Sequence, residues 1–98
     1  MKKLHPETLA IRAQLDRTEH QEHSVPLYLT SSYIFEDAED MRASFAEEKE
    51  RNIYSRFGNP NTDEFIQKIC LLEGAEDGFA TATGMAAVFS TFAALLQT

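Results

Sequence analysis

A tyrosine and an arginine stand two positions apart in the stretch NIYSRFGNPN at residues 52–61. In an extended segment, side chains at i and i+2 point to the same side, so Tyr54 and Arg56 would present a phenol and a guanidinium to one face, about 6 to 7 Å apart. The guanidinium offers a fixed fork of donors that matches phosphate oxygens, and the phenol adds a neutral donor. The pair therefore suits one phosphate, although on spacing alone a structural role at a half-buried strand stays open.

A second candidate anion site lies at residues 81–87, TATGMAA, where we expect a short strand to turn directly into a helix at Gly84. The first turn of a helix leaves backbone N–H groups unpaired at the positive end of the helix dipole, and glycine lets an oxyanion approach closely. A lone glycine at such a turn is common, and the glycine-rich spacing of nucleotide-binding loops is missing. A purely structural turn is therefore the alternative here.

Other residue types that can do chemistry favour ordinary roles. His20 and His23 flank Glu22 in an aperiodic polar stretch, which predicts a solvated loop and no metal site. Cys70 lies beside isoleucines and is predicted to be a small core residue, not a nucleophile. Charged or terminal surroundings do not favour the neutral amine needed for a Schiff base at any of the four lysines, Lys2, Lys3, Lys49 and Lys68. We predict no catalytic residue in this chain.

The elements that must position these residues alternate between helices and extended segments. Apolar residues at helical spacing predict short helices within residues 4–15 and 37–48, and the polar stretch at 17–24 predicts a loop. Residues 26–35, PLYLTSSYIF, are predicted to be extended, as is NIYSR at 52–56. Both faces of the longer segment mix apolar and hydroxyl residues, so we expect it to lie against a partner.

The second half of the chain starts with the clearest helix signal. Asn59 can cap a helix that has Pro60 at its first position and ends at Gly74. The residues expected to be buried on this helix are Phe65, Ile69 and Leu72. FATA at 79–82 is predicted to be a short strand, and residues 85–96, apolar or small on every side, a helix that needs burial all round. Since that strand lacks a parallel partner and that helix lacks an end cap, we expect the N-terminal part of a larger α/β protein.

Composition narrows the possible partners and location. The 98 residues include 16 acidic and 9 basic side chains, and the net charge of −7 disfavours nucleic-acid and anionic-membrane partners. Carboxylates gather between residues 36 and 50, which we interpret as a solvated helix face. The single cysteine cannot form an internal disulfide, no secretory leader is recognisable, and no apolar run reaches the roughly 20 residues needed to cross a bilayer. These features predict a soluble, cytoplasmic protein.

Two motifs in fixed order resemble a known family. YSRFGNPN, followed after one helix by LEGAEDGFATATGMAA, resembles the N-terminal part of the pyridoxal-phosphate enzymes of cysteine and methionine metabolism, which include cystathionine γ-synthase, homoserine-ester sulfhydrylases and methionine γ-lyase. TLAIRAQ and PLYLTSSYIF also resemble this family's opening segments, so the resemblance covers nearly the whole chain. It implies a fold-type I α/β transferase, with residues 1–58 as an N-terminal arm with short helices on a neighbouring subunit and 59–98 as the start of the cofactor-binding large domain.

The resemblance also implies a cofactor, ligands and partners. Pyridoxal 5'-phosphate would be the cofactor, with Tyr54 and Arg56 as ligands of its phosphate in a neighbouring subunit's active site. The backbone N–H groups of Gly84 and Met85 would bind the phosphate held by their own subunit. An amino-acid substrate and a homo-oligomer with shared active sites follow from this arrangement. The Schiff-base lysine lies in the family beyond the last residue of this chain, so the chain alone is expected to be inactive.

Three positions depart from the family's usual pattern without removing a phosphate contact. Thr83 stands where serine is frequent, Phe57 replaces a frequent tyrosine, and Asn61 interrupts the usual Asn-Pro-Thr run.

Within the family, RTEHQEHSVPLYLTSSYIF is most similar to the sulfhydrylases of O-succinylhomoserine or O-acetylhomoserine, which use sulfide to make homocysteine. Cystathionine γ-synthase or methionine γ-lyase is the alternative within the family. A stand-alone interaction or anion-binding module is the alternative from another class.

Overall fold

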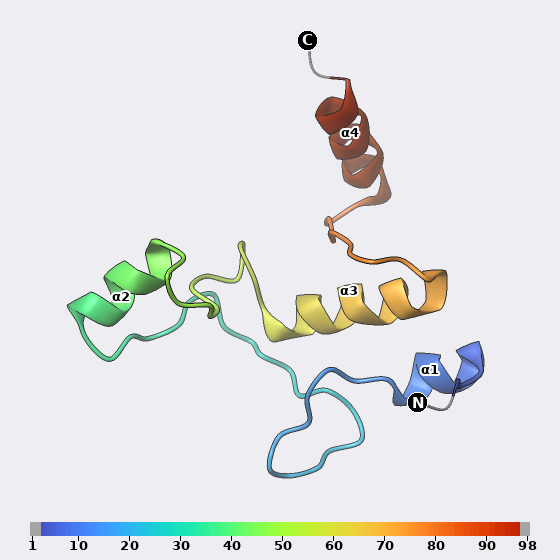
Figure 1. Ribbon diagram of the computed structural model, residues 1–98, viewed down its shortest axis with the longest axis horizontal. Coiled ribbons are helices and arrows are strands. Elements are labelled where there is room, and N and C mark those ends of the chain that lie inside the picture. The colour runs from blue at the N-terminus through green and yellow to red at the C-terminus, as the bar shows by residue number, and fades with distance from the viewer. Residues whose placement is uncertain (1–2, 97–98) are drawn as a thin grey trace.

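The computed structural model describes residues 3–96, and within that range it contains four helices and no strand. The helices are α1 (Pro6–Arg12), α2 (Ala38–Phe45), α3 (Pro60–Glu73) and α4 (Gly84–Leu95) (Figure 1). All four predicted helices are confirmed, and residues 17–24 are irregular as expected. The strand predicted at 79–82 is wrong, because no segment among the described residues pairs with it and a lone strand leaves its backbone groups without partners.

The two segments predicted to be extended meet at one point. Ser32 and Tyr54 form an isolated antiparallel bridge, the only pairing of its kind in residues 3–96. The prediction for 26–35 and 52–56 is therefore confirmed only at this bridge. The ladder does not continue, because the chain turns immediately after Tyr54.

Local sequence explains both ends of α3. The Asn59 side chain accepts a hydrogen bond from the Asn61 N–H at 2.9 Å, and Pro60 occupies the first helical position, where a missing N–H costs nothing. Gly74 ends the helix with φ of 68°, in the left-handed region that glycine adopts without a Cβ clash, and its N–H donates to the Cys70 carbonyl. The predicted start and end of this helix are confirmed.

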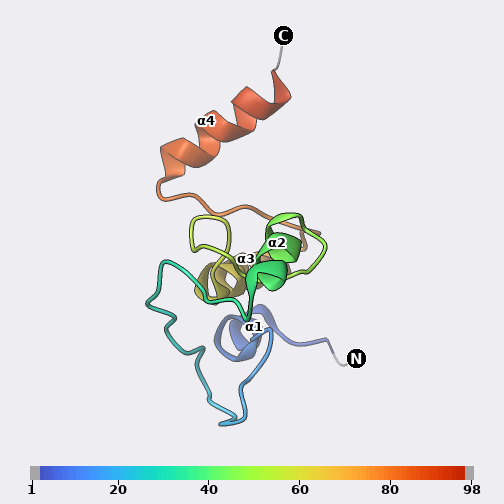
Figure 2. The same cartoon turned by 90° about the vertical axis from the view of Figure 1, so that its left-hand side faces the viewer.

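The chain buries little apolar surface. Its radius of gyration is 16.4 Å, against about 13 Å for a compact domain of this length. Its accessible surface is 8508 Å², against about 5,700 Å² for a folded monomer of 11.1 kDa. Within the described residues only α1 and α3 contact each other as helices, and α4 projects away from them (Figure 1, Figure 2). No helix in that part of the chain is long and apolar enough to cross a membrane.

The apolar stripe predicted to be buried on α3 is exposed. Phe65 is 60% exposed, and Ile69 and Leu72 are also open to solvent. The buried residues of this helix are Glu64 and Cys70. The prediction was wrong because a helical stripe is buried only where another element covers it, and no element within residues 3–96 covers that face.

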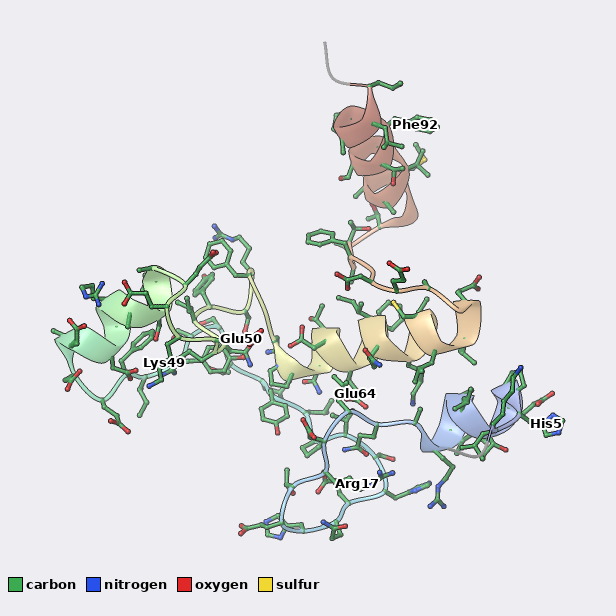
Figure 3. The ribbon with its side chains drawn as sticks, viewed as in Figure 1. His5, Arg17, Lys49, Glu50, Glu64 and Phe92 are labelled. Carbon is green, nitrogen blue, oxygen red and sulfur yellow. The ribbon has the colours of Figure 1, made fainter. Side chains whose placement is uncertain are left out.

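Two other segments of the chain lie against α3 and cover its two buried residues, Glu64 and Cys70. The Leu15 N–H donates to both carboxylate oxygens of Glu64, at 2.9 and 3.0 Å, and Figure 3 shows Glu64 facing the N-terminal segment. The backbone at Gly78 approaches so closely that a Cβ there would lie 3.2 Å from the sulfur of Cys70 and 3.3 Å from Ile66. The predicted burial of Cys70 is confirmed.

Candidate functional site

Tyr54 and Arg56 lie together at a turn. The Tyr54 carbonyl accepts hydrogen bonds from the N–H groups of Phe57 at 2.9 Å and Gly58 at 3.1 Å, so the chain reverses after the bridge with Ser32. The Arg56 guanidinium carbon lies 5.3 Å from the centre of the Tyr54 ring, within cation–π range. The two side chains therefore share one side, as predicted, but through a turn and a cation–π contact, not through the alternation of a strand.

Both side chains are available to a ligand. Tyr54 and Arg56 are exposed, and in the part of the chain that the structure describes neither the phenol nor the guanidinium makes a hydrogen bond or an ion pair. Two neighbouring donors without acceptors, one of them permanently charged, form the kind of group that binds an anion. The arrangement leaves the donors of Arg56 free while the guanidinium lies near the Tyr54 ring.

Hydrogen bonds from residues in and after the turn hold it against the preceding extended segment. The Ser55 N–H donates to the Ser31 carbonyl at 2.8 Å, and the Ser55 hydroxyl donates to the Thr30 carbonyl. The Asn59 amide donates at 3.1 Å both to the Tyr28 carbonyl and to the Ser55 hydroxyl oxygen. Residues 28–32 therefore hold the turn from one side.

Asn61 extends this fastening with a paired contact. Its amide nitrogen donates to the Pro26 carbonyl at 2.7 Å, and its amide oxygen accepts from the Tyr28 N–H at 2.7 Å. A side-chain amide can thus replace a strand partner for this stretch of backbone. The sequence analysis noted Asn61 only as a departure from the family pattern and missed this pairing. A side-chain amide next to the helix cap Asn59 could have indicated a contact to backbone.

Asp40 in α2 fastens the other side of the turn. Its carboxylate accepts hydrogen bonds from the Lys49 amine at 2.6 Å, the Glu36 N–H at 3.0 Å and the Arg51 guanidinium at 3.3 Å. The Lys49 hydrogen bond, followed by that from the Glu36 backbone, lowers the pKa of Asp40. The interpretation of residues 36–50 as a solvated acidic face is therefore wrong for Asp40, which is buried because two cations and a backbone donor satisfy it.

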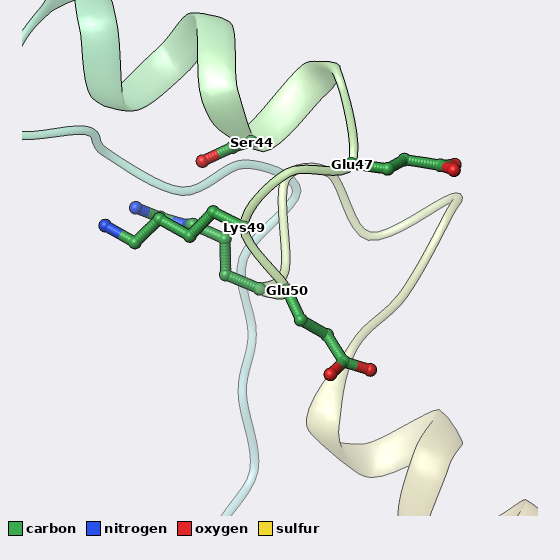
Figure 4. A pocket seen from close by; sticks show the side chains of 5 residues that line it. Ser44, Glu47, Lys49 and Glu50 are labelled. Carbon is green, nitrogen blue, oxygen red and sulfur yellow. The ribbon is translucent and has the colours of Figure 1, made fainter.

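A polar hollow of about 400 Å³ lies beside this ion-paired group, lined by Ser44, Glu47, Lys49, Glu50 and Arg51. Figure 4 shows the Lys49 amine directed to the same side as the Ser44 hydroxyl, whereas the carboxylates of Glu47 and Glu50 point away. The hollow is open to solvent, and its cations are already engaged with Asp40.

The first turn of α4 offers two free backbone donors. The Thr83 hydroxyl accepts from the Ala86 N–H at 3.0 Å, and the Thr83 carbonyl accepts from the Ala87 N–H at 3.3 Å. The N–H groups of Gly84 and Met85 have no acceptor within residues 3–96. Gly84 and Met85 are both exposed, and apart from chain neighbours and the helix's own backbone no atom lies within 4 Å of a Cβ built on Gly84.

The structure does not bring the two candidate groups together within one chain. Tyr54 and Arg56 lie on the turn before α3, and Gly84 and Met85 lie at the start of α4, in separate parts of Figure 1. No hydrogen bond joins the two groups among the described residues. Within one chain, each group therefore offers its donors separately.

The remaining candidates lie apart from these groups. His20 and His23 are both exposed in the irregular 17–24 stretch. No cluster of three metal-ligating side chains occurs among residues 3–96.

Comparisons with known proteins bear on the whole chain. Residues 7–98 match the family model described as Cys/Met metabolism PLP-dependent enzyme. The chain is 48% identical over 84 residues to the O-succinylhomoserine sulfhydrylase of Pseudomonas aeruginosa, a match that covers 86% of this chain and 21% of that protein. It is 39% identical over 97 residues to the L-methionine gamma-lyase of Fusobacterium nucleatum, covering 99% of this chain and 25% of that protein.

A solved structure gives the same picture in three dimensions. A crystal structure described as that of an O-acetylhomoserine (thiol)-lyase from Campylobacter jejuni, with N'-pyridoxyl-lysine-5'-monophosphate, matches with a TM-score of 0.78 at 36% identity. The match covers 89% of this chain and 21% of that chain. The chain spans about a fifth of the length of the first curated relatives that it matches.

Proposed function

This chain belongs to the Cys/Met metabolism family of pyridoxal-phosphate-dependent enzymes, as its motifs predicted, and we propose that it is the N-terminal segment of a sulfhydrylase within that family. In this proposal the complete protein is a fold-type I α/β transferase. Residues 1–58 form the arm that packs on a neighbouring subunit, and residues 59–98 begin the large domain. The complete protein acts in the cytoplasm as a homodimer or homotetramer.

The observation that carries the proposal is the pair of Tyr54 and Arg56. Their side-chain donors are free, while hydrogen bonds hold the turn that carries them. A phosphate fits this pair, because Arg56 can donate its fork of N–H groups to two oxygens while the phenol donates to a third. The free N–H groups of Gly84 and Met85 fit the same phosphate from the other side, at the positive end of the α4 dipole.

Because the two groups lie apart in one chain, we assign them to two different copies. Tyr54 and Arg56 reach the phosphate held by a neighbouring subunit, and Gly84 and Met85 bind the phosphate of their own. Each active site then needs both subunits, so a homo-oligomer follows.

When bound, the cofactor supplies an electron sink for bond changes at the substrate's carbon atoms. The residues of this chain bind and orient the phosphate, and no group in it is assigned a proton-transfer step. The proposed reaction of the complete protein replaces the acyloxy group of O-succinylhomoserine or O-acetylhomoserine by sulfide and gives homocysteine. The names of two relatives, an O-succinylhomoserine sulfhydrylase and an O-acetylhomoserine (thiol)-lyase, support this choice.

The test of the phosphate assignment is Arg56→Ala in the complete protein. Loss of a charge-assisted contact to phosphate should lower the affinity for pyridoxal 5'-phosphate roughly 10- to 100-fold, measured by titrating the cofactor-free protein. Arg12→Ala is the matched control, because Arg12 is also an exposed arginine whose side chain makes no bond among the described residues. Equal affinity in the Arg56→Ala variant and the wild type would remove Tyr54 and Arg56 from the site.

The alternative within the family is elimination, as in the methionine gamma-lyases that the chain also resembles. Assaying homocysteine formation from a homoserine ester and sulfide against release of an α-keto acid separates the two reactions. Predominant α-keto acid release would replace the sulfhydrylase proposal by a lyase.

The alternative from another class is a stand-alone, non-catalytic module. It requires residues 1–98 to fold alone, with a sharp cooperative melt. The small apolar burial and the exposed α4 argue against it. A cooperative transition of the isolated segment in calorimetry would favour the module.

A further inference from the structure

The turn that carries Tyr54 and Arg56 is closed at its base by a contact across the loop. A Cβ on Gly58 would lie 3.0 Å from the side-chain oxygen of Asn52, so these two residues meet where the loop begins and ends. A shift of Asn52 toward Gly58 would therefore press on the backbone two residues after Arg56.

Arg51 fixes the position of Asn52. Its guanidinium donates to the Asn52 carbonyl at 3.2 Å and to the Ile34 carbonyl at 2.7 Å. The same group lies 4.4 Å from the centre of the Phe35 ring. The guanidinium thus ties the start of the loop to the segment before α2, and each of these contacts depends on its orientation.

Asp40 sets that orientation from the buried side. Its side chain is 6% exposed and accepts from Arg51 at 3.3 Å, while Lys49 at 2.6 Å neutralises it further. Asp40 is itself fixed, because its N–H donates to the Asp37 side chain at the start of α2 and its carboxylate accepts from the Glu36 N–H. A path of direct contacts therefore runs from α2 through Asp40 and Arg51 to the base of the loop.

The exposed ion pairs of this region have no such connection. Glu39 and Glu48 both bind Arg42, at 2.7 and 2.8 Å, in pairs whose side chains are more than half exposed. Among the described residues the Arg42 guanidinium hydrogen-bonds only these two carboxylates, so this exposed network does not reach the loop. Burial and connection to the loop distinguish Asp40 from its acidic neighbours.

We infer that Asp40, acting through Arg51, is a positioning residue that holds Tyr54 and Arg56 in the geometry that binds the cofactor phosphate. This inference rests on the proposed function. It assigns the buried ion pair a role in the active site of a neighbouring subunit, although neither Asp40 nor Arg51 touches the ligand.

The test compares two ligands that differ only in the phosphate. The complete, cofactor-free protein is titrated calorimetrically with pyridoxal 5'-phosphate and with pyridoxal. Asp40→Asn should weaken pyridoxal 5'-phosphate binding roughly 10- to 100-fold, since small misplacements of a binding group have effects of this size. Pyridoxal binding should change less than about twofold, because the contact that Asp40 supports is absent from that complex. Arg51→Lys, which keeps the charge and loses the fork, should give the same pattern.

Glu39→Gln is the matched control, because it neutralises an exposed carboxylate of the same helix and should leave both affinities unchanged. In the Arg56→Ala background, Asp40→Asn should produce a smaller further loss than in the wild type, because only the Tyr54 contact is then left for Asp40 to position. That non-additivity would not arise from a general loss of stability.

Three results would overturn the inference, and they differ in what they say about the proposed function. Unchanged pyridoxal 5'-phosphate affinity in both Asp40→Asn and Arg51→Lys, with Arg56→Ala still weak, would remove only the positioning role. Parallel loss of both ligands in both variants would mean that the ion pair supports folding and not phosphate geometry. An unaffected Arg56→Ala variant would remove the phosphate assignment itself and the inference with it.

Discussion

The two proposed halves of the phosphate site are held in opposite ways. Polar contacts fix the turn of Tyr54 and Arg56 to α2 on one side and to residues 26–32 on the other, all within this chain. The first turn of α4 is capped by Thr83, but the helix behind it contacts no other helix among the described residues. Its large apolar side chains are exposed over its whole length.

The difference follows from the physics of the two kinds of contact. A hydrogen bond needs only one well-placed partner, so a short segment can complete a polar network by itself. Apolar burial grows with the area removed from water, so a helix that is apolar on every side needs cover from several elements. The turn of Tyr54 and Arg56 is therefore held by contacts within this segment, whereas burial of α4 would need cover from further elements.

Phe92 on α4 gives the sharpest test of this contrast (Figure 3). It is 57% exposed here, so Phe92→Ala should leave the helical circular dichroism of isolated residues 1–98 almost unchanged. In the complete protein, where we expect α4 to be covered, the same change should lower the free energy of unfolding by about 3 to 5 kcal/mol in urea titrations. No loss in the complete protein would mean that α4 remains exposed there.

Asn61 tests the polar side of the comparison. Asn61→Ala removes both contacts to the backbone of residues 26–28, worth about 1 to 2 kcal/mol together. The Tyr28 amide should then exchange with solvent roughly 5 to 30 times faster in hydrogen-exchange experiments. Asn61→Asp separates the two contacts, because it keeps the acceptor for the Tyr28 N–H and turns the donor to the Pro26 carbonyl into a repelling oxygen. Unchanged exchange in Asn61→Ala would show that the paired contact does not hold this segment.

Thr83 gives a smaller effect at the other half-site. Thr83→Ala removes the cap on the Ala86 N–H and should destabilise the first turn of α4 by about 1 kcal/mol. The readout is the exchange rate of the Ala86 amide, which should rise. Thr83→Ser keeps the hydroxyl and should preserve protection. A rise in both variants would point to the threonine methyl group and not to the cap.

How much of the fold and of the candidate site could be predicted depends on whether the sequence signal acts through neighbouring residues. Asn59, Pro60 and Gly74 bound α3 as the sequence indicated, because a cap, a first-turn proline and a left-handed glycine act through neighbouring residues only. A short motif also predicted that the side chains of Tyr54 and Arg56 lie on one side. Their placement at a turn was not predicted, because the sequence does not show how far two extended segments pair.

Long-range polar contacts were the main features that sequence reasoning missed. Asp40 was counted as one carboxylate among several, since nothing local distinguishes the one that meets Lys49 and Arg51 from those that meet water. The stripe led by Phe65 was expected to be buried because periodicity shows which face is apolar, but not whether this segment supplies its cover.

The polar stretch at 17–24 contains a further network of this kind, centred on Glu22. Its carboxylate accepts from the Thr18 hydroxyl at 2.6 Å, the Thr18 N–H at 2.9 Å and the Gln14 amide at 3.2 Å. Hydrogen bonds from the Thr18 side chain and then its backbone lower the pKa of Glu22 from 4.5 to about 2. The sequence alone predicted only a solvated loop here.

The smallest expected effect is the pH dependence of this loop. Since the folded pKa of Glu22 lies below its ordinary value, its contribution is fully present above about pH 4.5 and is lost as the pH falls through 2. The Glu22 carboxyl should therefore titrate near pH 2 by NMR in residues 1–98. Thr18→Val removes the hydroxyl donor and should move the midpoint toward 4.5, while Thr18→Ser should not. A wild-type midpoint near 4.5 would mean that the loop is open in solution. Of these two segments, the turn of Tyr54 and Arg56 would then be the one that polar contacts within the chain hold.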